Sequence, residues 1–221
     1  MGKSVEGCRR SNDTVCLFTT GTPMKPHSLV VFTFLSVSLL CSVPNAAGQG
    51  LVEVRLADTE YRFVDVSFTA KSGVVFDGFY VGVPGSNELN VGGGYAFKRG
   101  ALTLTPLVYA VIGKEGGQRG VKIALLAAFE RDRWKFLSFA GYYVRAKGST
   151  DSYQVLDTAD LTRTLATRWE FGVQAGFFRT GGAWNTQIGP LLKLNDSHGV
   201  WAVSYRFGNE NEFRVGRVLV F

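Results

Sequence analysis

The feature that most constrains the fold of this chain is a period of two in the placement of bulky apolar side chains. From about Tyr61 onward, segments of roughly ten residues carry such side chains at alternate positions, and short turns of Gly, Asn, Asp and Arg separate them. Successive side chains of a β-strand point to opposite faces, so the pattern predicts strands with one apolar and one polar face. We expect about ten strands, and eight or twelve are also compatible with the pattern.

Residues 164–178 show the alternation most clearly. Read as one strand, they place Trp169 and Phe171 on one face and Arg168 and Glu170 on the other. The same reasoning predicts further strands at residues 61–69, 74–83, 89–98, 101–112, 121–130, 134–146, 183–194, 200–207 and at the C-terminus.

Two architectures use strands of this kind. A soluble sandwich or barrel turns its apolar face inward, whereas a membrane barrel turns that face to lipid and keeps a polar lumen. Here the apolar face carries Trp and Tyr near strand ends, as at Trp134, Trp169 and Trp201, and the opposite face holds glycines between charges. These features favour an all-β, antiparallel, up-and-down transmembrane β-barrel. A soluble periplasmic barrel that binds an apolar ligand remains an alternative.

The N-terminal region has the features of an export signal. After Met24 come Lys25, an apolar run from Ser28 to Val43, and small residues. We therefore predict a signal peptide at 24–48, a mis-called extension at 1–23 and one barrel domain at 49–221. Its three cysteines, Cys8, Cys16 and Cys41, all precede residue 49, so the predicted domain has no disulfide or thiolate chemistry.

The C-terminus ends on a spaced pattern of Arg214, Gly216, Leu219 and Phe221. This pattern resembles the terminal assembly signal of small bacterial outer-membrane β-barrels. The resemblance implies an outer-membrane location and contact with outer-membrane lipid. It also implies recognition by the barrel insertion machinery and by periplasmic chaperones. Arg217 conflicts with it: this residue shares parity with Leu219 and would face lipid unless its side chain snorkels to the headgroups or a bulge turns it inward.

The predicted strand order leaves one difficulty. If Phe221 is periplasmic, the longest connection, 147–163, is periplasmic as well, whereas such barrels usually keep their long loops outside. Either residues 152–157 form an additional strand or the barrel is atypical.

The polar face predicts a charged lumen. Eight-to-ten-stranded barrels have interiors wide enough only for side chains or a thin water path. The charges predict either a salt-bridged plug that stiffens a structural barrel or a narrow, weakly anion-preferring pore. The inward parity assigns Lys98, Lys122, Lys135, Arg145, Arg168, Lys193, Arg206 and Arg214 as cations, and Asp65, Glu130, Glu170 and Glu212 as anions.

Catalytic signals are weak. The predicted domain has one histidine, His198, beside Asp196 and Ser197, but three neighbouring residues cannot form a relay, since their side chains diverge. A lipid-modifying or hydrolytic outer-membrane enzyme that uses His198 with residues of other strands stays open. We assign no catalytic residue, metal site or cofactor. Nucleic-acid binding is not expected, because the basic residues are scattered rather than clustered.

Overall fold

The computed structural model describes residues 48–113, 118–148 and 151–221. The predicted signal peptide and N-terminal extension lie outside these residues, apart from Gly48, at which the first strand begins. No helix among the described residues is long and apolar enough to cross a membrane.

The strands form one antiparallel sheet that closes on itself. In chain order they are β1 (Gly48–Ala57), β2 (Arg62–Ala70), β3 (Val74–Val83), β4 (Ser86–Tyr95), β5 (Phe97–Arg99), β6 (Leu102–Gly113), β7 (Arg119–Arg131), β8 (Trp134–Lys147), β9 (Tyr153–Ala166), β10 (Trp169–Thr180), β11 (Ala183–Asp196), β12 (Gly199–Gly208) and β13 (Glu212–Val220). Because β4 and β5 both pair with β6, they are two parts of one barrel strand interrupted at Ala96.

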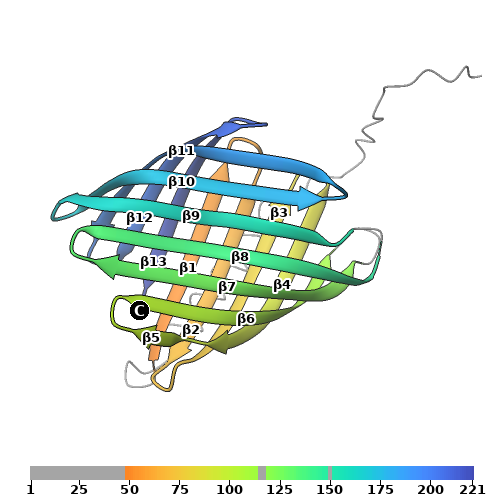
Figure 1. The fold of residues 1–221 in the computed structure, drawn as a ribbon, viewed down its shortest axis with the longest axis horizontal. Helices are drawn as coiled ribbons and strands as arrows, with labels where there is room; N and C mark the ends of the chain where they lie inside the picture. The colour runs from red at the N-terminus through yellow and green to blue at the C-terminus, as the bar shows by residue number, and fades with distance from the viewer. Residues whose placement is uncertain (1–47, 114–117, 149–150) are drawn as a thin grey trace, which may run out of the picture.

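The barrel therefore has twelve strands, within the predicted range. β1 pairs with β13, which closes the barrel and leaves no free sheet edge. Figure 1 shows the strands of the front wall crossing those of the back wall at a steep angle, as expected for strands tilted around a barrel axis.

The structure corrects the predicted strand list in three places. β1 was not predicted, and β9 occupies most of the segment treated as a long connection, where an additional strand at 152–157 was one of two alternatives. The predicted single strand 164–178 is wrong, because Thr167 and Arg168 form a tight turn between β9 and β10. Arg168 is exposed in this turn and does not face the lumen from a strand.

The additional strand β9 removes the topological difficulty. Both termini of the barrel now lie at one end, which we call the terminus end, together with the short turns at 71–73, 100–101, 132–133, 167–168 and 197–198. At the opposite end, which we call the loop end, β1, β3, β6, β8, β10 and β12 finish, and the chain continues to the next strand after two to five residues. The longer connections thus lie opposite the termini, as in outer-membrane barrels.

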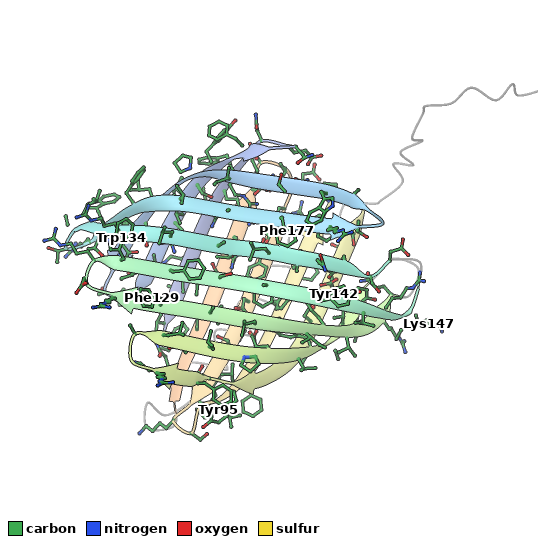
Figure 2. The ribbon with its side chains drawn as sticks, in the orientation of Figure 1. Tyr95, Phe129, Trp134, Tyr142, Lys147 and Phe177 are labelled. Carbon is green, nitrogen blue, oxygen red and sulfur yellow. The ribbon has the colours of Figure 1, made fainter. Side chains whose placement is uncertain are left out.

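The outer surface of the barrel is apolar. Trp169, Phe171, Trp201 and Val203 are 43%, 50%, 46% and 38% exposed, whereas Arg206 is 2% exposed in the interior. The side chains cover the barrel wall along its whole length, with Trp134 at one end of β8 and Lys147 at the other (Figure 2). A soluble barrel would show the reverse distribution, so the structure supports the membrane-barrel interpretation.

Arg217 lies on the outer face at the terminus end and is neutralised there. Its guanidinium donates two hydrogen bonds to Asp196, at 2.8 and 3.0 Å, and lies 4.8 Å from the ring centroid of Trp201. The pairing of β12 with β13 continues in register through Gly216 without a bulge. Of the two predicted explanations, the structure therefore favours the one in which the long side chain reaches the rim.

Candidate functional site

The terminus-end half of the lumen contains a cavity of about 600 Å³. Its walls carry ion pairs that join strands. The Lys135 ammonium lies 2.7 Å from a Glu170 oxygen, and Glu170 also accepts hydrogen bonds from Thr162 and Asn195 at 3.0 and 2.9 Å. Because Glu170 is buried, these three donors offset the cost of keeping a carboxylate out of water.

A second ion pair lies beside the first on the same part of the cavity wall, because Lys193 of β11 is the cross-strand partner of Glu170 on β10. The Lys193 ammonium lies 2.7 Å from Asp160, which also accepts a hydrogen bond of 2.8 Å from the Gln174 amide. Ser204 donates to the Gln174 carbonyl oxygen at 2.9 Å. The wall is thus a connected polar network that presents few unpaired charges to the cavity.

An arginine cluster forms the inner end of the cavity. The carboxylate of Asp157 accepts hydrogen bonds from Arg55 and, at 3.1 Å, from Arg214. Arg214 lies 4.0 Å from the ring centroid of Tyr61, and Arg206 pairs with Glu212. Three guanidinium groups from β1, β12 and β13 thus meet in the interior at this level, each beside a carboxylate.

A β-bulge in β9 aims Asp157 into this cluster. Phe139 of β8 pairs with Thr158 and the next residue, Ala140, pairs with Leu156, so Asp157 is an additional residue without a partner on β8. Such a bulge changes the phase of the strand, and as a result both Asp157 and Thr158 point inward.

Gly176 makes room for the arginine cluster on the neighbouring strand β10. A Cβ atom at this position would lie 2.7 Å from the Arg206 guanidinium. A side chain here would therefore displace Arg206, which is a physical reason for a glycine on the lumen face.

Aromatic side chains fill the lumen beyond the cluster, toward the loop end. Phe79 is central: its ring centroid lies 5.6 Å from that of Phe63, 5.1 Å from Tyr109 and 5.7 Å from Phe139. We call the set of rings the aromatic constriction. It comprises Phe63, Phe79, Tyr109, Phe139, Tyr143 and Tyr153, and all of these except Phe139 are buried.

An ion pair is embedded among these rings. The Lys122 ammonium lies 2.5 Å from a Glu88 oxygen, and it lies 5.0 and 5.2 Å from the ring centroids of Phe79 and Tyr153. Glu88 also accepts hydrogen bonds from Asn90 and from the Tyr153 hydroxyl. The constriction is therefore held by polar contacts as well as by ring packing.

The structure places the sequence-predicted lumen residues in four different locations. Inside the lumen lie Lys122, Lys135, Lys193, Arg206, Arg214, Asp65, Glu170 and Glu212. Lys98 and Glu130 are exposed at the terminus-end mouth, where they line the cavity, and Arg145 is exposed near the loop end, 3.3 Å from Asp151. Arg168 belongs to neither place, as described above.

Sequence reasoning missed several interior charges. Glu53 and Arg55 lie on the unpredicted β1. Asp157 and Asp160 lie on β9, of which only residues 152–157 were considered as a strand, as one of two alternatives. Glu88 lies outside the predicted bounds of its strand. With these residues included, cations and anions of the described lumen are similar in number. The cations are Arg55, Lys98, Lys122, Lys135, Lys193, Arg206 and Arg214, and the anions are Glu53, Asp65, Asp77, Glu88, Glu130, Asp157, Asp160, Glu170 and Glu212.

The structure brings no catalytic set together around His198. This residue lies in the turn between β11 and β12, and its backbone amide donates to the Asp196 carboxylate at 2.8 Å. Within the described chain its imidazole makes no hydrogen bond or ion pair, and Asp196 instead binds Arg217. The described residues also contain no group of three or more His, Cys, Asp or Glu side chains placed to hold a metal ion.

The comparisons with known proteins find solved porins that share the fold of this chain. No protein-family model and no curated protein matches the chain. Among solved structures, the KdgM porin aligns with a TM-score of 0.59 and 15% identity, over 78% of this chain and 99% of its own, and so does the same porin in complex with disordered oligogalacturonate. The NanC porin aligns with a TM-score of 0.55 and 13% identity, over 77% of this chain and 98% of its own. At these identities the similarity shows a shared fold: a closed, antiparallel, twelve-stranded barrel.

Proposed function

We propose that this chain is an outer-membrane β-barrel that forms a narrow pore, with the aromatic constriction as its narrowest part. The observation that carries the proposal is a cavity of about 600 Å³ that is lined by the Lys135–Glu170 and Lys193–Asp160 ion pairs and reaches the arginine cluster, inside a barrel with an apolar outer wall. The porin fold of KdgM and NanC supports it. In this orientation the terminus end is periplasmic and the loop end faces outward.

A structural barrel with a sealed lumen is the second candidate. The observation that favours it is the burial of the rings and of the Lys122–Glu88 pair, which leaves little room beside them. Both candidates share the same location and the same assembly route. We expect Arg214, Gly216, Leu219 and Phe221 to act as the assembly signal for the insertion machinery, with periplasmic chaperones as earlier partners.

The selectivity of the pore is a separate matter. The weak anion preference predicted from the sequence stays a prediction, and the nine carboxylates against seven cations in the described lumen do not favour it. One of the similar structures holds a polyanionic sugar, oligogalacturonate. We do not extend that ligand to this chain, because its interior arginines are paired with carboxylates.

Planar-bilayer conductance tests the proposal. The wild-type barrel is expected to conduct weakly, and Phe79→Ala combined with Tyr109→Ala is expected to raise the conductance several-fold, because two central rings of the constriction are removed. Val108→Ala is the matched control, since Val108 adjoins Tyr109 on the outer face. A silent wild type with a conducting double variant would identify the sealed structural barrel. Silence of both would refute the pore.

A further inference from the structure

The two rims of the barrel differ in charge. At the loop end, the described exposed cations and anions are similar in number. The cations are Arg62, Arg119, Arg145, Lys147 and Arg179, and the anions are Asp58, Glu60, Asp151 and Glu210. At the terminus end, cations dominate: Lys71, Lys98, Arg99, Arg131, Arg133, Arg163 and Arg168 are exposed, and Arg217 lies on the outer face. Among the described side chains of that rim, the exposed carboxylates are Glu130, Asp132 and Asp196.

Four of these arginines lie on two adjoining hairpins at this rim, and we call them the basic arc: Arg131, Arg133, Arg163 and Arg168. They come from the adjacent β7–β8 and β9–β10 hairpins. The amide of Thr164, next to Arg163, donates to the Arg133 carbonyl oxygen at 2.8 Å, which joins the two hairpins at the rim. The arc lies at the Trp134 end of the front wall (Figure 2).

Arg163 connects the basic arc to two exposed aromatic side chains of the outer wall, Trp134 and Phe171. It shares the outer face of β9 with Leu161 and Leu165. Across the sheet it pairs with Trp134 on one side and Phe171 on the other, and its guanidinium lies 5.7 Å from the centroid of the Trp134 ring. A guanidinium beside an exposed tryptophan, three residues from the strand end, has the position of an interfacial side chain.

Three of the four arginines of the arc have no carboxylate partner among the described residues. Within the described chain, no carboxylate lies within 4.0 Å of Arg133, Arg163 or Arg168, and Arg131 reaches only the exposed Asp132, at 3.9 Å. Arg217 shows the contrast, because on the same rim it is bound through two hydrogen bonds to Asp196. The fold thus neutralises one outward arginine at this level and leaves a neighbouring group available to an external anion.

We propose that the basic arc binds the headgroup phosphates of anionic phospholipids in the leaflet at the terminus end. A guanidinium binds phosphate oxygens through paired hydrogen bonds, and an anionic leaflet attracts clustered arginines at its surface. The neighbouring Trp134 and Phe171 hold the barrel wall at the depth where headgroups begin. The inference rests on the proposed membrane location but not on the pore.

Native mass spectrometry of the detergent-folded barrel tests this proposal, with phosphatidylglycerol and phosphatidylethanolamine as probes. The test variant is Arg133→Gln with Arg163→Gln and Arg168→Gln. The control is Arg62→Gln with Arg119→Gln and Arg179→Gln, which removes the same charge from the loop end and includes Arg179, whose guanidinium lies 4.6 Å from the ring centroid of Trp184. All six residues are exposed, and heat-modifiable gel mobility verifies folding.

The wild type is expected to retain phosphatidylglycerol in preference to phosphatidylethanolamine. The terminus-end variant is expected to lose at least about tenfold in retained phosphatidylglycerol, and the loop-end variant to change little. Equal losses in both variants, or equal retention of the two lipids by the wild type, would overturn the proposal. Conductance separates this result from the pore, because the arc lies outside the lumen: a wild type that is silent in bilayers but retains phosphatidylglycerol refutes the pore and keeps the lipid site.

Discussion

Placing an arginine at two depths on the outer face of β6 tests whether this face contacts lipid. Val108 lies near the middle of the strand and Ile112 lies next to its loop-end terminus. Both are β-branched, and they are 54% and 55% exposed, so burial within the protein does not distinguish them. Four residues at about 3.4 Å each span about 14 Å along the strand, or about 10 Å along the membrane normal after correction for a tilt of about 40°.

This depth difference sets the expected costs. Arginine near the bilayer midplane destabilises a barrel by about 2–4 kcal/mol, and near the interface by about 0–1 kcal/mol. Val108→Arg is therefore expected to lower the free energy of unfolding by about 2–4 kcal/mol, and Ile112→Arg by less than about 1 kcal/mol. Denaturant titration in phospholipid vesicles, followed by tryptophan fluorescence, measures both. Costs below about 0.5 kcal/mol at both positions would match a water-facing surface and refute the lipid-facing assignment.

Three further changes test the interior and the end of the chain. Glu88→Gln removes the counter-ion of the buried Lys122 ammonium and is expected to lower the free energy of unfolding by about 3–5 kcal/mol in the same titration. The double variant Glu88→Leu with Lys122→Met is expected to be nearly neutral, because it removes both charges. A similar loss of stability in both variants would show that the unpaired charge is not the cause. Asp157→Asn is expected to cost about 3 kcal/mol, because Arg55 and Arg214 lose a shared carboxylate, and a cost below about 1 kcal/mol would show that their remaining partners suffice. Deletion of Phe221 is expected to reduce folded protein in the outer membrane of cells, as measured by heat-modifiable mobility, without reducing unassisted folding into vesicles; loss in both settings would indicate a packing role instead.

The barrel class was predictable because lipid imposes a strict pattern on the outer wall. Every second residue of a spanning strand meets acyl chains, so the apolar set on β7 and β12 reads directly from the sequence, as Ile123 and Trp201 illustrate. The choice between a lipid-facing and a core-facing apolar stripe was also predictable, from tryptophans near strand ends and from glycines on the opposite face, such as Gly176.

The contacts inside the lumen were less predictable, because lumen side chains follow no repeating pattern and are constrained only by the side chains they contact. Glu88 and Lys122 are paired from strands that are far apart in the sequence, and no local pattern reveals such a partner. β1 was missed for a simpler reason: its apolar side chains alternate over only a few residues and directly follow the predicted export signal. The predicted surplus of lumen cations arose largely from these omissions, because the missed strands contribute Glu53, Asp157 and Asp160.

The bulge at Asp157 explains why β9 escaped detection and why the arginine cluster exists. Before it, Tyr153 and Val155 face inward at odd positions; after it, Thr158, Asp160 and Thr162 face inward at even positions. A search for one unbroken period of two fails across such a phase change. With a regular strand, Asp157 would face lipid whenever Asp160 faced the lumen, which is costly for a carboxylate and leaves Arg55 without this partner. The bulge that interrupts the period of two is therefore also the feature that allows both Asp157 and Asp160 to point into the lumen.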